Sequence, residues 1–175
     1  PRYGKPMPWT FDPGWEYQPA ISPDGTQVAY SARSSEGTAS KQFILVKVIG
    51  GDSSRRLTEG LDPEGGAAWS PDGRMIAFVR YQQATKKIGI FMIPAGGGPE
   101  SMIWSSEEER IQTLGWSPDG QWLLASINDK RASQIAAIEL LTGKIRRLVE
   151  GAEFGYPGFG VTADGRRLIY SKHPL

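Results

Sequence analysis

The chain has 175 residues, of which 39% are hydrophobic, and its 20 basic and 19 acidic side chains leave a formal net charge of +1. This length corresponds to one domain, or to part of a large one, with enough apolar residues to form a core. The balanced charge gives no extended basic surface for nucleic acid, and the absence of cysteine excludes disulfides and thiol chemistry.

No stretch of the sequence is apolar enough to span a membrane as a helix, which takes about 18 residues or more. The two most apolar segments, 43–49 and 135–141, are interrupted by Lys47 and Glu139. The chain opens with Pro1 rather than methionine, and we expect it to be a segment of a longer protein whose targeting sequence lies elsewhere.

A short turn sequence, Ser-Pro-Asp-Gly, recurs at 22–25, 70–73 and 117–120, and a fourth copy at 162–165 reads Thr-Ala-Asp-Gly. Successive copies are 48, 47 and 45 residues apart, and a fixed period of this size is typical of repeat architectures. Proline suits the second turn position, aspartate bonds nearby backbone, and glycine adopts the left-handed conformation that follows. We therefore predict structural turns at Asp24 and Gly25, Asp72 and Gly73, Asp119 and Gly120, and Asp164 and Gly165.

The first residues of the chain align with the end of a repeat. Trp9 precedes Asp24 by 15 residues, the distance at which Leu57 precedes Asp72. We therefore expect residues 1–10 to form the last strand of a preceding repeat.

Each repeat then reads as four short strands. The repeats cover about 17–58, 65–104 and 112–149, and a fourth runs from about 157 to 175 and stops after its second strand. Strands are expected at 17–21, 27–32, 43–49, 55–58, 67–69, 75–80, 88–93, 101–104, 113–116, 122–127, 135–141 and 145–149.

The second strand of each repeat is apolar at successive positions, which indicates that both faces of its sheet are covered. Ile76 and Phe78 should accordingly be almost inaccessible. Little helix is expected. Ser106 and the glutamates after it could cap one helical turn or form a solvated acidic loop.

Four antiparallel strands in each repeat of about 45 residues are typical of a β-propeller blade. Tandem hairpin sandwiches are the alternative, but the short strands, the single period and the two-sided burial favour the propeller. We predict an all-β fold, a β-propeller of four-stranded antiparallel blades with about 3.75 blades present. These would form a single partial domain over residues 1–175, part of a larger propeller.

The second repeat carries a family resemblance. Its residues 68–73, Ala-Trp-Ser-Pro-Asp-Gly, are followed by Ile76-Ala77-Phe78, by Ile90-Phe91-Met92-Ile93 and by a Gly-Gly turn. This pattern resembles the TolB-type propeller repeat, a WD-like repeat with a Pro-Asp signature. It is also similar to repeats in the propeller domains of prolyl-oligopeptidase-like enzymes and tricorn-type proteases. The resemblance covers nearly the whole chain and implies a propeller in a periplasmic or otherwise extracytoplasmic bacterial setting, but the repeat serves many functions.

The sequence offers no convincing catalytic residue, metal site or cofactor site. Residues 115–119 nearly match the Gly-x-Ser-x-Gly elbow of hydrolases, but the last position is aspartate and no helix is expected after it. The chain has one histidine, His173, which cannot build a triad or a metal cluster. The four turn aspartates belong to different blades, so each is expected to bond its own hairpin rather than share a cation.

The loops opposite the tight turns divide by charge. Loops between repeats are acidic and loops within repeats are mostly basic, which suggests a recognition surface, although charge runs on loops are usually only solvated. The candidate binding residues are Glu107, Glu108, Glu109, Lys86, Lys87, Lys130 and Arg131.

Two functions of different classes remain open at this point. The first is a non-catalytic module that binds a protein or peptide partner, with no nucleic acid contact and no membrane span in this chain. The second is the substrate-gating propeller of a prolyl-oligopeptidase-like or tricorn-like serine peptidase, whose catalytic domain is absent here. Incomplete blades also leave apolar faces that need covering, whether by closure into a four-bladed ring, by a second chain or by further blades. We expect self-association through these ends.

Overall fold

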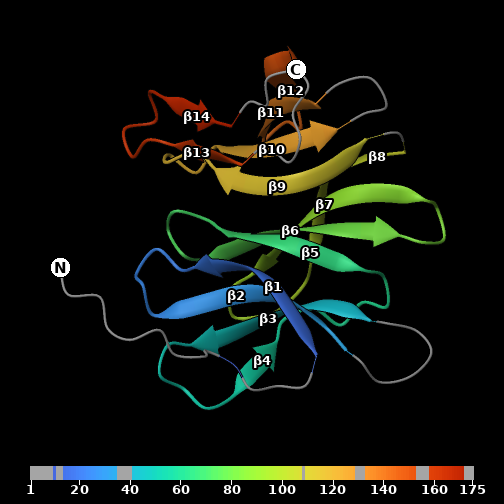
Figure 1. Ribbon diagram of the computed structural model, residues 1–175, viewed down its shortest axis with the longest axis vertical. Helices are drawn as coiled ribbons and strands as arrows, with labels where there is room; N and C mark the ends of the chain where they lie inside the picture. The colour runs from blue at the N-terminus through green and yellow to red at the C-terminus, as the bar shows by residue number, and fades with distance from the viewer. Residues whose placement is uncertain are drawn as a thin grey trace.

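The computed structural model describes residues 10, 14–34, 41–107, 109–128, 133–152 and 158–171. Within these ranges all regular structure is β-strand, with no helix, and the strands form three four-stranded sheets and one two-stranded sheet. Figure 1 shows the four sheets stacked in chain order, from blue to red. The predicted all-β architecture of four-stranded antiparallel sheets is confirmed.

Each four-stranded sheet is a meander in which neighbours in the sequence pair. The first sheet contains β1 (Trp15–Ile21), β2 (Gln27–Arg33), β3 (Gln42–Val48) and β4 (Ser54–Arg56). The second contains β5 (Glu64–Trp69), β6 (Met75–Gln82), β7 (Lys87–Pro94) and β8 (Ser101–Ser106). The third contains β9 (Arg110–Trp116), β10 (Trp122–Asn128), β11 (Ser133–Glu139) and β12 (Ile145–Ala152), and the two-stranded sheet contains β13 (Phe159–Val161) and β14 (Leu168–Tyr170).

The first strands of successive sheets, β1, β5, β9 and β13, contact one another in that order. Sheets packed face to face from a row of first strands are the blades of a β-propeller. We refer to β1, β5 and β9 as the inner strands. The Pro-Asp-Gly turns lie at the end of the stack on the left of Figure 1, the turn end, and the loops that follow the second and fourth strands lie at the loop end on the right.

Two inner strands are longer than the sequence pattern predicts. β5 begins at Glu64 rather than at residue 67, and β9 begins at Arg110 rather than at residue 113. Both strands contain a bulge that interrupts the alternation of apolar residues. The predicted strands begin at or just after the bulge, whereas the pairing with the neighbouring strand extends beyond it. The strand expected over residues 1–10, including Trp9, lies outside the described residues apart from Thr10, which is not in a strand.

The core lies between the sheets. Ile76 and Phe78 of β6 are 0% exposed, which confirms the burial expected for this strand. They pack against Ile44 and Val46 of the first sheet. Phe78 also stacks on Phe91, with ring centroids 5.8 Å apart. A second cluster of the same kind joins the second and third sheets.

Two tryptophans tie neighbouring sheets together at the turn end. Trp69 Nε1 donates to the carbonyl oxygen of Ala20 at 2.9 Å, and Trp116 Nε1 donates to that of Ala68 at 3.1 Å. Each indole therefore crosses from one sheet to the sheet before it. In the first sheet the equivalent position holds Ile21, which is 66% exposed.

Candidate functional site

The inner strands share one irregularity, a β-bulge towards their loop ends. In β1 the register shifts between Tyr17 and Ala20, so that two residues of this strand face one residue of β2. β5 shifts between Gly65 and Ala68, and β9 shifts at Gln112. Bulges redirect side chains and are common beside functional sites. The three bulges lie at equivalent positions of their strands, so irregular backbone from three neighbouring sheets lies close together.

A hollow of about 200 Å³ lies at these bulges, and we name it the inner-strand hollow. It is lined by all three inner strands, the start of β3, the end of β6 and the residue before β5. The lining residues are Tyr17, Gln18, Gln42, Pro63, Glu64, Gly65, Gly66, Val79, Tyr81, Ile111 and Gln112. Among these described residues, Glu64 alone carries a formal charge.

Gln18 bridges the first and second sheets across the hollow. Its backbone has a φ of 54°, an uncommon conformation for a residue other than glycine. Its Oε1 accepts from the backbone N–H of Gly66 at 2.8 Å and from Ser31 Oγ at 3.4 Å. A Cβ at Gly65 would lie 3.0 Å from the same oxygen, so a larger residue there would crowd the bridge.

Two polar atoms in the lining are unsatisfied. Tyr17 Oη and Gln112 Oε1 are shielded from solvent and have no hydrogen-bond partner within the described part of the chain. Burial raises the pKa of Tyr17, opposed by the charge of Arg33, so the phenol stays protonated and can donate. Unsatisfied buried polar atoms are rare in folded proteins because each one costs free energy.

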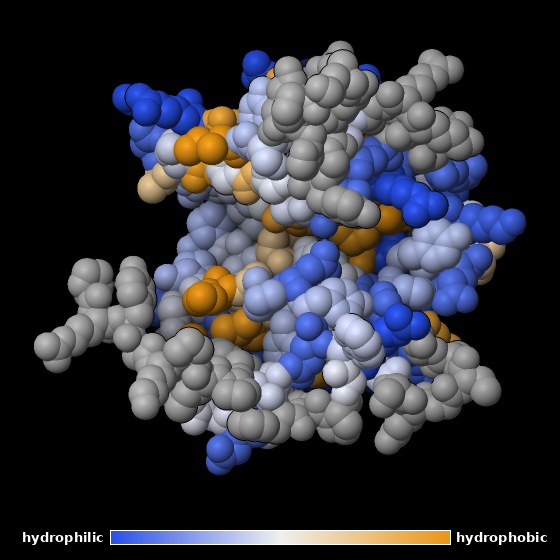
Figure 2. All heavy atoms as spheres, in the orientation of Figure 1, coloured by the Kyte–Doolittle hydropathy of each residue, from blue (hydrophilic) through white to orange (hydrophobic). Residues whose placement is uncertain are grey.

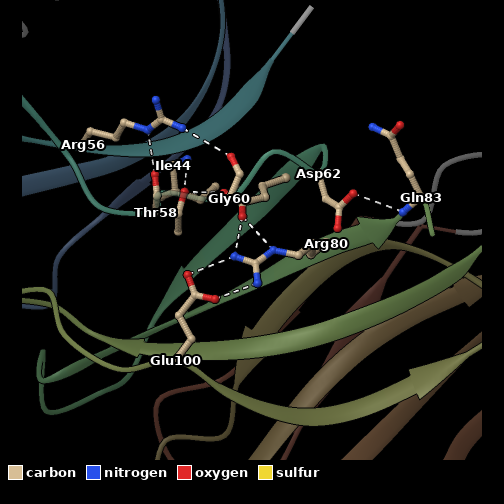
Figure 3. A network of polar contacts seen from close by, with 9 residues as sticks. Ile44, Arg56, Thr58, Gly60, Asp62, Arg80, Gln83 and Glu100 are labelled. Atoms are coloured by element: carbon tan, nitrogen blue, oxygen red, sulfur yellow. Dashed lines mark hydrogen bonds and ion pairs between the residues drawn. The ribbon is translucent and has the colours of Figure 1, made fainter. Parts of the chain in front are cut away.

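Glu64 joins the hollow to a polar network between the first two sheets, drawn in Figure 3. Its side chain is 0% exposed. Its Oε1 accepts from Arg80 Nε at 2.7 Å, and its Oε2 accepts from the Thr58 hydroxyl. Thr58 Oγ1 accepts in turn from the backbone N–H of Ile44 at 3.0 Å, and Arg80 Nη1 donates to Glu100 Oε2 at 2.6 Å. The network therefore links β3 of one sheet to β5 and β6 of the next.

Burial raises the pKa of Glu64, although the hydrogen bonds from Thr58 and Arg80 oppose this shift. The guanidinium of Arg80 also lies 4.5 Å from the ring centre of Phe91 and 5.2 Å from that of Phe78, where aromatic faces favour a cation. Arg80 thus balances a carboxylate that has no access to water.

The sequence analysis missed this network, but the sequence contains a signal for it. Thr58 and Glu64 stand 14 and 8 residues before Asp72, and Thr10 and Glu16 stand at the same distances before Asp24. In the structure the Thr10 hydroxyl donates to Glu16, as Thr58 does to Glu64. A repeated threonine and glutamate at fixed distances from the turn would have indicated a pair.

The structure brings together only some of the charged residues predicted for binding. Lys87 Nζ lies 3.2 Å from Glu107 Oε1, so these two predicted residues form an exposed ion pair instead of separate charged zones. Lys86 is exposed with a φ of 58°. The backbone N–H of Glu109 donates to Ser106 Oγ at 3.4 Å, a capping contact without a helix. Outside the described residues lie the other three predicted positions, Glu108, Lys130 and Arg131.

Exposed apolar side chains accompany the hollow at the loop end. Leu61, between β4 and β5, is 74% exposed, Tyr81 at the end of β6 is 44% exposed, and Trp15 at the start of β1 is 76% exposed. Figure 2 shows hydrophobic residues in orange at the surface in the middle of the molecule, towards the loop end, and others at the turn end on the left. The sequence analysis did not identify Leu61, a single apolar residue in a loop, or Tyr81, which lies one residue beyond the predicted end of its strand at residue 80.

The four turn sequences have one geometry. Ser70 Oγ donates to Asp72 Oδ1 at 2.6 Å, and Asp72 Oδ1 also accepts from the backbone N–H of Arg74 at 3.1 Å. Gly73 follows with a φ of 71°. The same bonds recur at Asp24, Asp119 and Asp164, beside Gly25, Gly120 and Gly165. The serine or threonine hydroxyl, followed by the backbone N–H, lowers the pKa of each aspartate.

The described residues contain no group of three or more histidine, cysteine, aspartate or glutamate side chains placed to hold a metal ion. In the same part of the chain no helix is long and apolar enough to cross a membrane.

Comparison with known proteins gives a family match and several structural matches. The sequence model of the TolB beta propeller domain matches residues 10–174. Dipeptidyl-peptidase 5 of Porphyromonas gingivalis is 24% identical over 173 residues, which cover 93% of this chain and 24% of that protein.

Among solved structures, TolB from Acinetobacter baumannii matches with a TM-score of 0.74 at 19% identity, covering 92% of this chain and 38% of that one. The β-propeller domain of the Trilobed protease from Pyrococcus furiosus matches with a TM-score of 0.65 at 18% identity, covering 86% of this chain and 46% of that one. The chain thus spans less than half the length of each of these three proteins. At such identities the structural matches establish the propeller fold alone.

Proposed function

The chain belongs to the TolB beta propeller domain family, and we propose that it is a non-catalytic module that binds a protein or peptide at its loop end. One observation carries this proposal. Tyr81, which is 44% exposed, lines a hollow in which Tyr17 and Gln112 carry unsatisfied hydrogen-bonding atoms, and Leu61, which is 74% exposed, precedes the lining residue Pro63 by two positions. Apolar and aromatic side chains around a small pocket are typical of the residues that dominate binding at protein interfaces.

The geometry of Ser117 supports a role without catalysis. This serine is the one that the sequence places in a near match to the hydrolase elbow. Its Oγ donates to Asp119 Oδ1 and accepts from the backbone N–H of Trp122 at 2.9 Å. The hydroxyl is therefore engaged in a hairpin turn rather than exposed at the top of a strand as a nucleophile would be.

The likeness to two peptidases favours a second candidate, a propeller domain that gates substrate entry to a serine peptidase. In that case the peptide partner would be the substrate, and the catalytic residues would belong to another part of the protein. For either candidate we propose a periplasmic or otherwise extracytoplasmic setting, on the strength of the family resemblance.

Substitution of one leucine at each end of the stack tests the loop-end proposal. Leu61 at the loop end and Leu141 at the turn end are both highly exposed, at 74% and 93%. Immobilised wild-type chain, Leu61→Ala and Leu141→Ala would be compared for retention of proteins from a periplasmic extract. We expect Leu61→Ala to lose the retained partner and Leu141→Ala to keep it. Equal retention by the two variants would contradict the proposal.

Both candidates predict that this chain has no catalytic activity of its own, and a panel of peptide p-nitroanilides incubated with the isolated chain tests that shared expectation. We expect no release of p-nitroaniline, and release that survives purification of the chain to homogeneity would contradict a non-catalytic role.

A further inference from the structure

We infer that the inner-strand hollow binds an uncharged carboxamide group, the side chain of a glutamine or asparagine in the partner. This inference rests on the proposed function, because it names the chemistry that one part of the loop end recognises. It is argued from the size, the charge and the hydrogen bonding of the hollow.

The size of the hollow limits its occupant. A volume of about 200 Å³ is below the range of roughly 300–1,000 Å³ that is usual for pockets that hold a whole small molecule. It suits one side chain of a peptide that continues across the loop end. The exposed Tyr81 at its rim offers an aromatic surface for the rest of that peptide.

The charges at the hollow disfavour an ionised occupant. No lysine or arginine is among the described lining residues, so a carboxylate would lose its hydration without a cation to replace it. Glu64 is the one acidic residue of the lining, and both of its oxygens are already engaged by Thr58 and Arg80. An ammonium group would therefore find no free carboxylate in the described lining.

The unsatisfied hydrogen-bonding atoms of the lining residues favour a carboxamide among uncharged groups. Tyr17 Oη can donate and accept, and Gln112 Oε1 can accept, and both lack a partner within the described residues. Both residues line the hollow, but these two atoms are shielded from solvent, so the inferred occupant would have to draw them towards it by a change of side-chain rotamer. A carboxamide offers N–H donors and an acceptor oxygen in one neutral plane, and it would complement Gln112 in either orientation of the Gln112 amide.

The backbone around the hollow is prepared for close approach. Gln18 has a left-handed backbone conformation, and its side chain accepts a hydrogen bond from Gly66 of the next sheet. Uncommon backbone conformations of this kind persist where the surrounding structure holds them, often at binding sites.

The direct test is a titration of isotope-labelled chain with three short peptides, observed by NMR. The probes are N-acetyl-Gly-Xaa-Gly-N-methylamide with glutamine, glutamate or methionine at Xaa, so that only the glutamine peptide carries a primary carboxamide. The glutamine peptide should shift the backbone signal of Gly66 and the side-chain amide of Gln112, and it should bind about tenfold more tightly than the other two. Equal binding of the glutamate or methionine peptide at these signals, or no shift with glutamine, would overturn the inference.

Substitutions separate binding from folding. Tyr17→Phe and Gln112→Leu should each weaken binding of the glutamine peptide about tenfold. Gln121→Leu, at the turn end, should leave binding of this peptide unchanged. Tyr17→Phe removes an unsatisfied hydroxyl, so its melting temperature should match or exceed that of the parent. Unchanged peptide binding in both hollow variants would count against the inference.

Partner retention distinguishes failure of this inference from failure of the proposed function. If Leu61→Ala abolishes partner retention but the glutamine peptide does not bind, the loop end is the binding surface and the carboxamide assignment is wrong. If the glutamine peptide binds but Leu61→Ala retains the partner fully, the hollow is selective and the proposed function fails.

Discussion

At the scale of single residues, the most constrained side chain is Glu64. It is removed from water at the junction of two sheets, and Arg80 and Thr58 supply every bond to its carboxylate that the structure describes. A buried charge that loses its partner costs far more than an exposed one, because water cannot replace the missing bonds. Arg80 ties this carboxylate to the neighbouring strand of its own sheet, and Thr58 connects it to Ile44 of the first sheet.

We predict that Arg80→Ala lowers the free energy of unfolding by about 3–5 kcal/mol, since it leaves Glu64 buried and unpaired. The control is Lys87→Ala, which breaks an exposed ion pair with Glu107 and should cost at most about 1 kcal/mol. Urea denaturation of both variants measures the difference. A cost for Arg80→Ala no larger than that for Lys87→Ala would show that the network is not a buried ion pair.

The turn aspartates predict a dependence of stability on pH. Bonds from Ser70 and from the backbone of Arg74 hold the pKa of Asp72 below its usual value of 3.8. A carboxyl whose pKa falls on folding adds stability above its unfolded pKa, near pH 4, and loses that contribution as the pH falls through its folded pKa. The loss of unfolding free energy caused by Asp72→Asn should therefore be larger at pH 7 than at pH 3, as measured by urea denaturation of the variant and the parent. A gap that stays constant or widens in acid would contradict this assignment.

At the scale of elements, the hairpin turn determines the structure of each blade at the turn end, and the bulge determines it at the loop end. The hairpin fixes the turn end with bonds that lie within a single sequence motif, so it could be predicted from Ser-Pro-Asp-Gly. The bulge shapes the loop end through contacts between sheets, such as the bond from Gly66 to Gln18, which are 48 residues apart. Local sequence carries no sign of that contact, and this is why the strands and turns were predictable while the hollow was not.

We predict that Gly73→Ala lowers stability by about 1 kcal/mol, because its φ of 71° strains any residue with a Cβ. No clash contributes, since the nearest contact of that Cβ would be Pro23 Cδ at 3.8 Å. Gly96 is the matched control. It lies outside the left-handed region with no atom within 4 Å of a Cβ, so Gly96→Ala should be neutral or stabilising. Thermal melts that rank the two variants in the opposite order would refute the turn argument.

At the scale of the whole molecule, neighbouring sheets bury apolar side chains against one another, but the outer face of the first sheet has no neighbouring sheet among the described residues to bury it. Ile21, on the outer face of the first sheet, occupies the place that Trp69 fills in the second, and it borders a cavity of about 580 Å³ with Val28 and Tyr30. A second cavity, of about 650 Å³, lies between the third sheet and the two-stranded sheet, and its lining mixes apolar residues with Asp119, Arg146, Asp164, Arg166 and Arg167. The apolar surface around Ile21 favours association.

We therefore predict that the isolated chain self-associates at micromolar concentration, as measured by light scattering. Ile21→Glu should yield a monomer, because it places a charge on the outer face of the first sheet. Leu141→Glu, at a position 93% exposed outside that face, should still self-associate. A parent chain that is monomeric at every concentration tested would exclude association through these faces.

The central claim is that partners bind at the loop end, and site-specific photo-crosslinking tests it most directly. A benzophenone amino acid would replace Leu61 in one sample and Leu141 in another, and each would be irradiated in a periplasmic extract. We expect a crosslinked partner from position 61 and none from position 141. A partner crosslinked from position 141 and not from position 61 would contradict it.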